Sequence, residues 1–192
     1  MQFGDYRIEI VPDTEFWLDG GAMFGIVPRV LWERVCPPDE LNRVTLNANC
    51  LFIDTGKEKI LIETGMGEKW TPKEIGMYGI HRERPFAESL RSIAGCGPDD
   101  ITIVVNTHLH FDHAGGNTIG PEAVPQFPNA RYFVSRSEFD HANSPHERDQ
   151  ASYLAENWQP VKQRGQLELK PDSYEVVEGL QMETIVGHSN TM

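Results

Sequence analysis

Alternating and continuous apolar positions along the chain predict its strands. Residues 7–11 alternate polar with apolar side chains and end at Pro12-Asp13, which predicts a strand followed by a turn. Two β-rich segments, 45–54 and 59–63, are separated by a glycine-containing turn and predict a hairpin. The uninterrupted β-branched run at 101–105 is typical of a strand that is covered on both faces.

Helical signals lie between these strands and after them. Pro85 opens a periodic apolar stretch that stops at Gly95, and segments 135–142 and 147–158 also predict helices. Further strands are predicted at 131–134 and 180–186. Because strands alternate with helices after one early antiparallel hairpin, the fold class is α/β with layered architecture.

Composition indicates a globular protein and restricts its partners. Apolar residues make up 39% and charged residues 24% of the 192 positions, values that are typical of one globular domain with a single core. Lys and Arg number 17 against 29 Asp and Glu, a formal net charge of -12. Such a surface repels phosphate backbones and anionic headgroups, so we expect a small-molecule substrate, no nucleic acid and no membrane.

The cysteines and the first residues bear on the compartment. Cys36, Cys50 and Cys96 form neither an even disulfide framework nor a CxxC pair, which favours free thiols in a reducing cytoplasm. Residues 1–7 show no basic segment followed by an apolar run, and no apolar run in the sequence reaches the length of a membrane span. We therefore expect a cytoplasmic protein.

The chemistry of the chain is concentrated directly after the buried strand at 101–105, in His108-Leu109-His110-Phe111-Asp112-His113. Residues i and i+2 of an extended chain project to the same side, so His108 and His110 can bind one ion together. Asp112 and His113 come where the chain turns, and their side chains can reach a second ion. Imidazole and carboxylate are ligands of zinc or a comparable divalent metal.

This motif, followed by Ala-Gly-Gly, resembles the signature of the metallo-β-lactamase superfamily. The segments 49–54 and 60–65 resemble the opening hairpin of that superfamily, and Gly187-His188 resembles its next metal-ligand motif. Within the superfamily, residues 21–25, Leu31-Trp32 and 127–130 are similar to the branch of quorum-quenching lactonases and methyl-parathion-hydrolase-like enzymes.

The resemblance implies an αββα sandwich that holds two divalent metal ions, zinc above all. It places His108, His110 and His188 on the first ion, and Asp112 and His113 on the second. Asp112 is also the implied catalytic residue, which orients a metal-bridged hydroxide as well as binding metal. Binding to metal brings the pKa of water down to about 7, which makes this hydroxide available.

The resemblance also suggests a substrate pocket in the apolar, glycine-rich segment that begins at Gly20. Met23, Phe24 and Trp32 are its candidate lining residues. Apolar residues of this kind are more often core or dimer contacts, so a core role and a homodimer remain alternatives.

The sequence departs from the family pattern at three places. Glu63 stands where the family usually has Asp, and it either orients a ligand histidine from behind or ends the strand in solvent. His188 lacks the prolines that usually stiffen its loop. The sequence ends at Met192 before the bridging aspartate and last histidine of the family. We therefore expect a single domain over 1–192 that is the N-terminal part of the sandwich, truncated at its C-terminus.

The implied activity is metal-dependent hydrolysis of an ester-like bond, with a lactone favoured. Hydrolysis of an organophosphate triester or a thioester is the alternative, because the same hydroxide can attack either centre. A di-iron oxidoreductase is disfavoured, because that branch has Glu where this chain has His110. A non-catalytic family member with an incomplete metal site is the alternative of another class.

Overall fold

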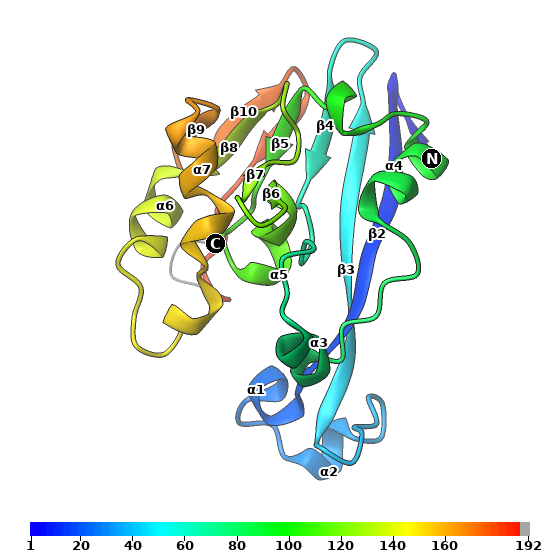
Figure 1. Ribbon diagram of the computed structural model, residues 1–192, viewed down its shortest axis with the longest axis vertical. Helices are drawn as coiled ribbons and strands as arrows, with labels where there is room; N and C mark the ends of the chain where they lie inside the picture. Colours follow the sequence, from blue (N-terminus) through cyan, green and yellow to red (C-terminus); the bar gives the residue numbers. More distant parts are fainter. Residues whose placement is uncertain (189–192) are drawn as a thin grey trace.

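One large mixed sheet organises the chain in the computed structural model, which describes residues 1–188. Its strand order is β1-β2-β3-β4-β5-β8-β9 (Figure 1). The strands from β1 to β4 pair antiparallel, whereas β4, β5, β8 and β9 pair parallel. Their bounds are β1 (Gln2–Phe3), β2 (Tyr6–Asp19), β3 (Arg43–Asp54), β4 (Lys59–Ile62), β5 (Ile103–Val105), β8 (Arg131–Ser135) and β9 (Leu167–Lys170).

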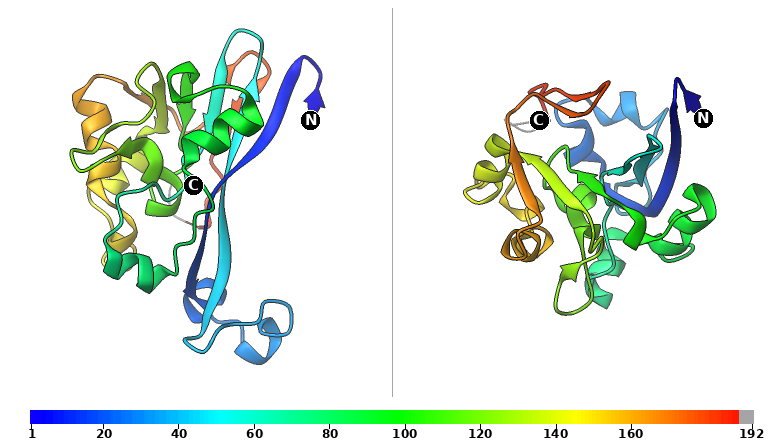
Figure 2. Two further views of the ribbon diagram at one scale, coloured as in Figure 1. Left: turned by 45° about the vertical axis from the view of Figure 1, so that its right-hand side comes forward. Right: turned by 90° about the horizontal axis from the view of Figure 1, so that it is seen from above.

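Short helices and two small hairpins surround this sheet. The helices are α1 (Gly20–Phe24), α2 (Arg29–Trp32), α3 (Pro72–Tyr78), α4 (Phe86–Ala94), α5 (Phe111–Ala114), α6 (Arg136–Ala142) and α7 (Gln159–Gln163). The hairpins pair β6 (Thr118–Ile119) with β7 (Val124–Pro125), and β10 (Tyr174–Val177) with β11 (Leu180–Met182). The long β2–β3 ribbon extends beyond the body of the molecule and carries α1 and α2 at its far end (Figures 1 and 2).

The two faces of the sheet build two separate cores. Phe52, Leu61, Val104 and Tyr132 point to one face, where they pack with the buried face of α4. Their direct neighbours in sequence point to the opposite face, because side chains alternate along a strand. That second face, which includes Ile53, Ile60, Ile103 and Phe133, packs against β10 and β11.

The structure corrects the predicted turn at Pro12-Asp13. β2 runs through both residues, and its pairing register with β3 shifts between Pro12 and Thr14. A proline is tolerated where a bulge interrupts the hydrogen-bond ladder. The strand therefore bends at this point and does not end there.

The predicted helix at 147–158 is also wrong. This segment contains only two short 3-10 turns, Gln150–Ser152 and Ala155–Asn157. Between them Tyr153 forms an isolated antiparallel bridge with His110 of the motif. A contact with a distant segment thus overrides the local helical pattern.

The other elements fall close to their predicted positions. The strand predicted at 180–186 ends at Met182, and the apolar loop that starts at Gly20 begins with α1, which is capped by the side chain of Asp19. Among residues 1–188, no helix is long and apolar enough to cross a membrane. The α/β class and the early hairpin are confirmed.

Candidate metal centre

The histidine motif begins just beyond the carboxyl end of β5. This strand lies between β4 and β8, and all three of its residues are buried. The chain then turns, so that His110 precedes the first residue of α5 and Asp112 and His113 lie within that helix. The short turn explains why ligands adjacent in sequence can face different directions.

Three histidines meet on one side of this segment. One nitrogen each of His108, His110 and His188 lies within 4.8 Å of the others. His188 Nε2 is 3.2 Å from His110 Nδ1, and the ring centroids of His108 and His188 are 5.0 Å apart. The structure thus brings together the three residues that the resemblance implied for the first ion.

A bound metal ion explains the burial of these histidines better than contacts among polar side chains alone. His108 is fully buried and His110 is 8% exposed, yet Nε2 of each is buried without a hydrogen-bond partner. Leaving such groups unsatisfied is costly, whereas three imidazoles are a familiar zinc-binding set.

The second predicted group is arranged differently. Glu63, His108 and His113 form a further set of potential ligand atoms within 4.8 Å of one another. His113 Nδ1 lies 3.5 Å from Glu63 Oε2, and His113 Nε2 lies 3.5 Å from Asp112 Oδ2. Asp112 is therefore beside His113 but belongs to neither compact set, and its roles as ligand and catalytic residue stay predictions. Glu63 contacts the motif instead of ending its strand in solvent.

The charge states suit metal binding. Burial, reinforced by the neighbouring histidines, lowers the pKa of His108 far below its ordinary value. Burial likewise lowers the pKa of His110 to about 4. Burial also opposes the charge on His113, but the hydrogen bond and negative charge of Glu63, with Asp112, raise its pKa. His108 and His110 are thus neutral at pH 7, the form in which imidazole binds a metal.

Side-chain and backbone groups from outside the motif hold its backbone in place. Glu63 Oε1 accepts a hydrogen bond of 2.8 Å from the Thr107 amide. The Thr64 amide donates to the His113 carbonyl at 2.8 Å, and Lys69 Nζ donates to the Gly115 carbonyl at 2.6 Å. The residues that carry these groups follow β4, so the end of β4 supports the loop that follows β5.

Two glycine-containing turns make this support possible by close backbone contact. A Cβ atom added at Gly67 would lie 2.3 Å from the Gly115 oxygen, and one at Gly116 would lie 2.2 Å from the Thr64 oxygen. Asn117 closes the loop through hydrogen bonds with Asn106 and Thr64. Only glycine lets the two turns approach this closely.

A cavity of about 280 Å³ opens beside the candidate centre. Its lining combines apolar and polar side chains: Phe16, Met23, Leu46, Asn47, Ala48, Asn49, Glu63, Asp112, His113 and His188. Met23, one of the three predicted pocket residues, lines this cavity, and its role in substrate binding stays a prediction. Phe24 and Trp32 instead stack on each other, with ring centroids 4.7 Å apart, and are not among the described lining residues.

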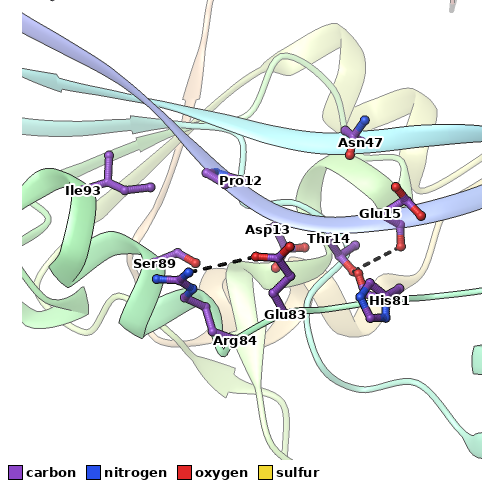
Figure 3. A pocket seen from close by; sticks show the side chains of 10 residues that line it. All are labelled: Pro12, Asp13, Thr14, Glu15, Asn47, His81, Glu83, Arg84, Ser89 and Ile93. Carbon is purple, nitrogen blue, oxygen red and sulfur yellow. Dashed lines mark hydrogen bonds and ion pairs between the residues drawn. The ribbon is translucent and has the colours of Figure 1, made fainter.

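A larger cavity of about 370 Å³ lies elsewhere, between β2 and the segment that leads into α4 (Figure 3). Glu15, Glu83, Arg84 and Ser89 contribute polar groups to its wall. None of its lining residues belongs to the two sets of potential metal ligands found among the described residues. The smaller cavity is therefore the one associated with the histidines.

Comparison with known proteins gives one family. A model described as the metallo-beta-lactamase superfamily matches residues 43–125. An N-acyl homoserine lactonase from Bacillus cereus is 31% identical over 157 residues, which are 77% of this chain and 57% of that protein. The chain thus spans little more than half the length of this relative.

Two solved structures agree with the sequence match. The crystal structure of a probable metal-dependent hydrolase from Staphylococcus aureus is 30% identical and superposes with a TM-score of 0.90, covering 100% of this chain and 68% of that one. An N-acyl homoserine lactone hydrolase with bound N-hexanoyl-L-homoserine is 26% identical, with a TM-score of 0.69 over 96% of this chain and 67% of that one. With its histidine motif at the end of β5, the chain belongs to the metallo-beta-lactamase superfamily, and its similarities lie among the N-acyl homoserine lactonases.

Proposed function

We propose that the protein is a metal-dependent hydrolase that cleaves an ester-like bond, with a lactone as its substrate. The observation that carries the proposal is the convergence of His108, His110 and His188 beside a cavity. Bound divalent ions would supply Lewis acidity and water with a pKa near 7. The names of the relatives favour the lactone over other esters.

Each side chain of the site has its own role in this proposal. His108, His110 and His188 would hold one zinc ion, and His113 with Asp112 would hold the other. The carboxylate of Asp112 lines the cavity, and in this proposal it would accept a hydrogen bond from the attacking water and orient it. Glu63 fixes the ring of His113 through Nδ1.

The cavity supports a substrate with two unlike ends. Phe16, Met23 and Leu46 offer an apolar wall, whereas Asn47 and Asn49 offer amide groups. An acyl chain would pack against the first set, and a polar head group would lie toward the second. This pairing is the support within the chain for an N-acyl lactone.

We also propose a cytoplasmic location, as part of the same hypothesis. Cys36, Cys50 and Cys96 are all free, and Cys50 and Cys96 are buried. Free thiols persist in reducing compartments.

Metal analysis combined with an activity panel tests the proposed function. We expect two zinc ions per chain and hydrolysis of an N-acyl homoserine lactone in preference to phosphotriesters or thioesters. His110→Ala should abolish the hydrolysis, whereas His146→Ala, at an exposed position, should leave it intact. A protein that binds less than one metal ion and hydrolyses none of these substrates would be a non-catalytic family member.

A further inference from the structure

A buried carboxylate on α6 contacts the backbone of the metal-binding motif. Glu138 lies in the first turn of α6, where its own amide donates to the Ser135 hydroxyl that caps the helix. Its side chain is fully buried, and Oε1 accepts a hydrogen bond of 2.8 Å from the Leu109 amide.

This amide occupies a critical position in the chain. Leu109 separates His108 from His110, so its peptide groups set the spacing and direction of both imidazoles. Glu63 binds the Thr107 amide in the same way, two residues earlier. Carboxylates from two different elements thus hold alternate amides of one short segment.

Tyr153 also contacts the motif. The ring of Tyr153 packs edge-on against the ring of His110, with centroids 4.7 Å apart and planes at 70°, and the two residues form a backbone bridge. Burial, together with the neighbouring charge of Glu138, raises the pKa of the Tyr153 hydroxyl. Glu138 thus contacts the backbone between His108 and His110, and Tyr153 contacts the ring of His110.

We propose that Glu138 and Tyr153 are positioning residues that set the affinity of the histidine site for zinc. Glu138 fixes the Leu109 amide, and the ring of Tyr153 packs against the ring of His110. The inference rests on the metal site of the proposed function and deepens it. Groups that orient metal ligands from behind typically change metal affinity by about 10–100-fold when they are removed.

Zinc affinity, measured by competition with a chelator in the absence of substrate, tests this role. Glu138→Leu removes the acceptor and should weaken zinc binding by about 10–100-fold. Glu138→Gln keeps an oxygen for the Leu109 amide and should retain most of the affinity. Tyr153→Leu removes the ring beside His110 and should weaken binding even if Glu138→Leu does not fold.

Two controls separate positioning from loss of stability. Asp140→Ala changes an exposed carboxylate on the same helix and should bind zinc as the wild type does. Val161→Ala opens a cavity in the core beneath α7, away from the motif, and should lower the unfolding temperature of the zinc-free protein without changing zinc affinity.

The inference would be overturned if Glu138→Leu and Tyr153→Leu bound zinc as tightly as Val161→Ala, or if Glu138→Gln were as weak as Glu138→Leu. Lactone hydrolysis is measured separately from zinc affinity. A wild-type protein that binds zinc but opens no lactone would reject the proposed substrate and leave the affinity comparison valid.

Discussion

His188 Nε2 lies 3.2 Å from His110 Nδ1, although the two residues are 78 positions apart in the sequence. His110 belongs to the turn after β5, whereas His188 follows β11 at the other end of the chain. The contact therefore joins the turn after β5 to the last residues that the structure describes. It makes the first candidate metal set depend on the tertiary fold.

His188→Ala should weaken binding of one zinc ion and leave the fold intact, because His188 is exposed and contributes to the histidine set alone. Zinc content after dialysis, measured with the unfolding temperature of the zinc-free protein, checks this result. His146→Ala is the matched control at another exposed histidine. Unchanged zinc content in His188→Ala would remove this residue from the site.

Glu63→Gln should keep the hydrogen bond from the Thr107 amide but lose the negative charge beside His113. We expect zinc affinity to fall by about 10-fold, as is typical for groups that orient a ligand histidine. Chelator competition measures the change. Equal affinity for Glu63→Gln and the wild type would show that the charge of Glu63 has no part in metal binding.

The zinc-free protein should lose stability on mild acidification. Burial lowers the pKa of His110 to about 4, from 6.5 in the unfolded chain, so between these values the unfolded state binds more protons. Stability associated with His110 is thus complete above pH 6.5 and falls as the pH drops toward 4. His108 acts in the same direction, whereas the raised pKa of His113 acts in the opposite one.

Urea unfolding at pH 7 and pH 5 in the presence of a chelator tests this pH dependence. His110→Asn removes one titrating group and should flatten the difference between the two pH values. Parallel behaviour of the variant and the wild type would contradict the assigned cause.

Gly67→Ala should be strongly destabilising, because its Cβ would lie 2.3 Å from the Gly115 oxygen at a φ of +67°. Left-handed strain and a forced backbone shift together should cost at least about 3 kcal/mol. Gly120→Ala, at φ +75° with no atom within 4 Å of the added carbon, should cost only about 1–2 kcal/mol. Similar unfolding free energies for the two variants would refute the close contact between the turns.

Arg82→Ala should show how much a buried ion pair contributes to stability. Arg82 binds Asp13 at 2.9 Å, and the Asp13 side chain is fully buried, so removal of the cation should cost about 3–5 kcal/mol. Arg84→Ala breaks an exposed contact with Glu83 at 4.0 Å and should cost less than about 1 kcal/mol. Denaturant unfolding measures the loss of unfolding free energy in each variant. Equal losses would show that the buried Asp13 side chain does not need its cation partner.

Local pattern was sufficient for most of the secondary structure and for the identity of the motif. The strand at 101–105 and the helix after Pro85 follow from runs and periods of apolar residues that depend only on neighbours in sequence. The pattern failed at 147–158, where Tyr153 pairs with His110, a contact with a segment about forty positions earlier. Helix propensity depends on neighbouring residues and carries no information about such a distant pairing.

The sequence by itself determined that His108, His110, Asp112 and His113 follow a buried strand and can turn toward metal ions. Only the tertiary structure decided that Glu63 contacts His113, that His188 meets His110, and that Glu138 holds the amide between His108 and His110. The physical reason is that the types of the candidate ligand residues and their spacing can be read directly from the sequence. The direction of each imidazole depends on hydrogen bonds and packing from β4, α6 and the segment after β11, which come together only when the sheet has formed.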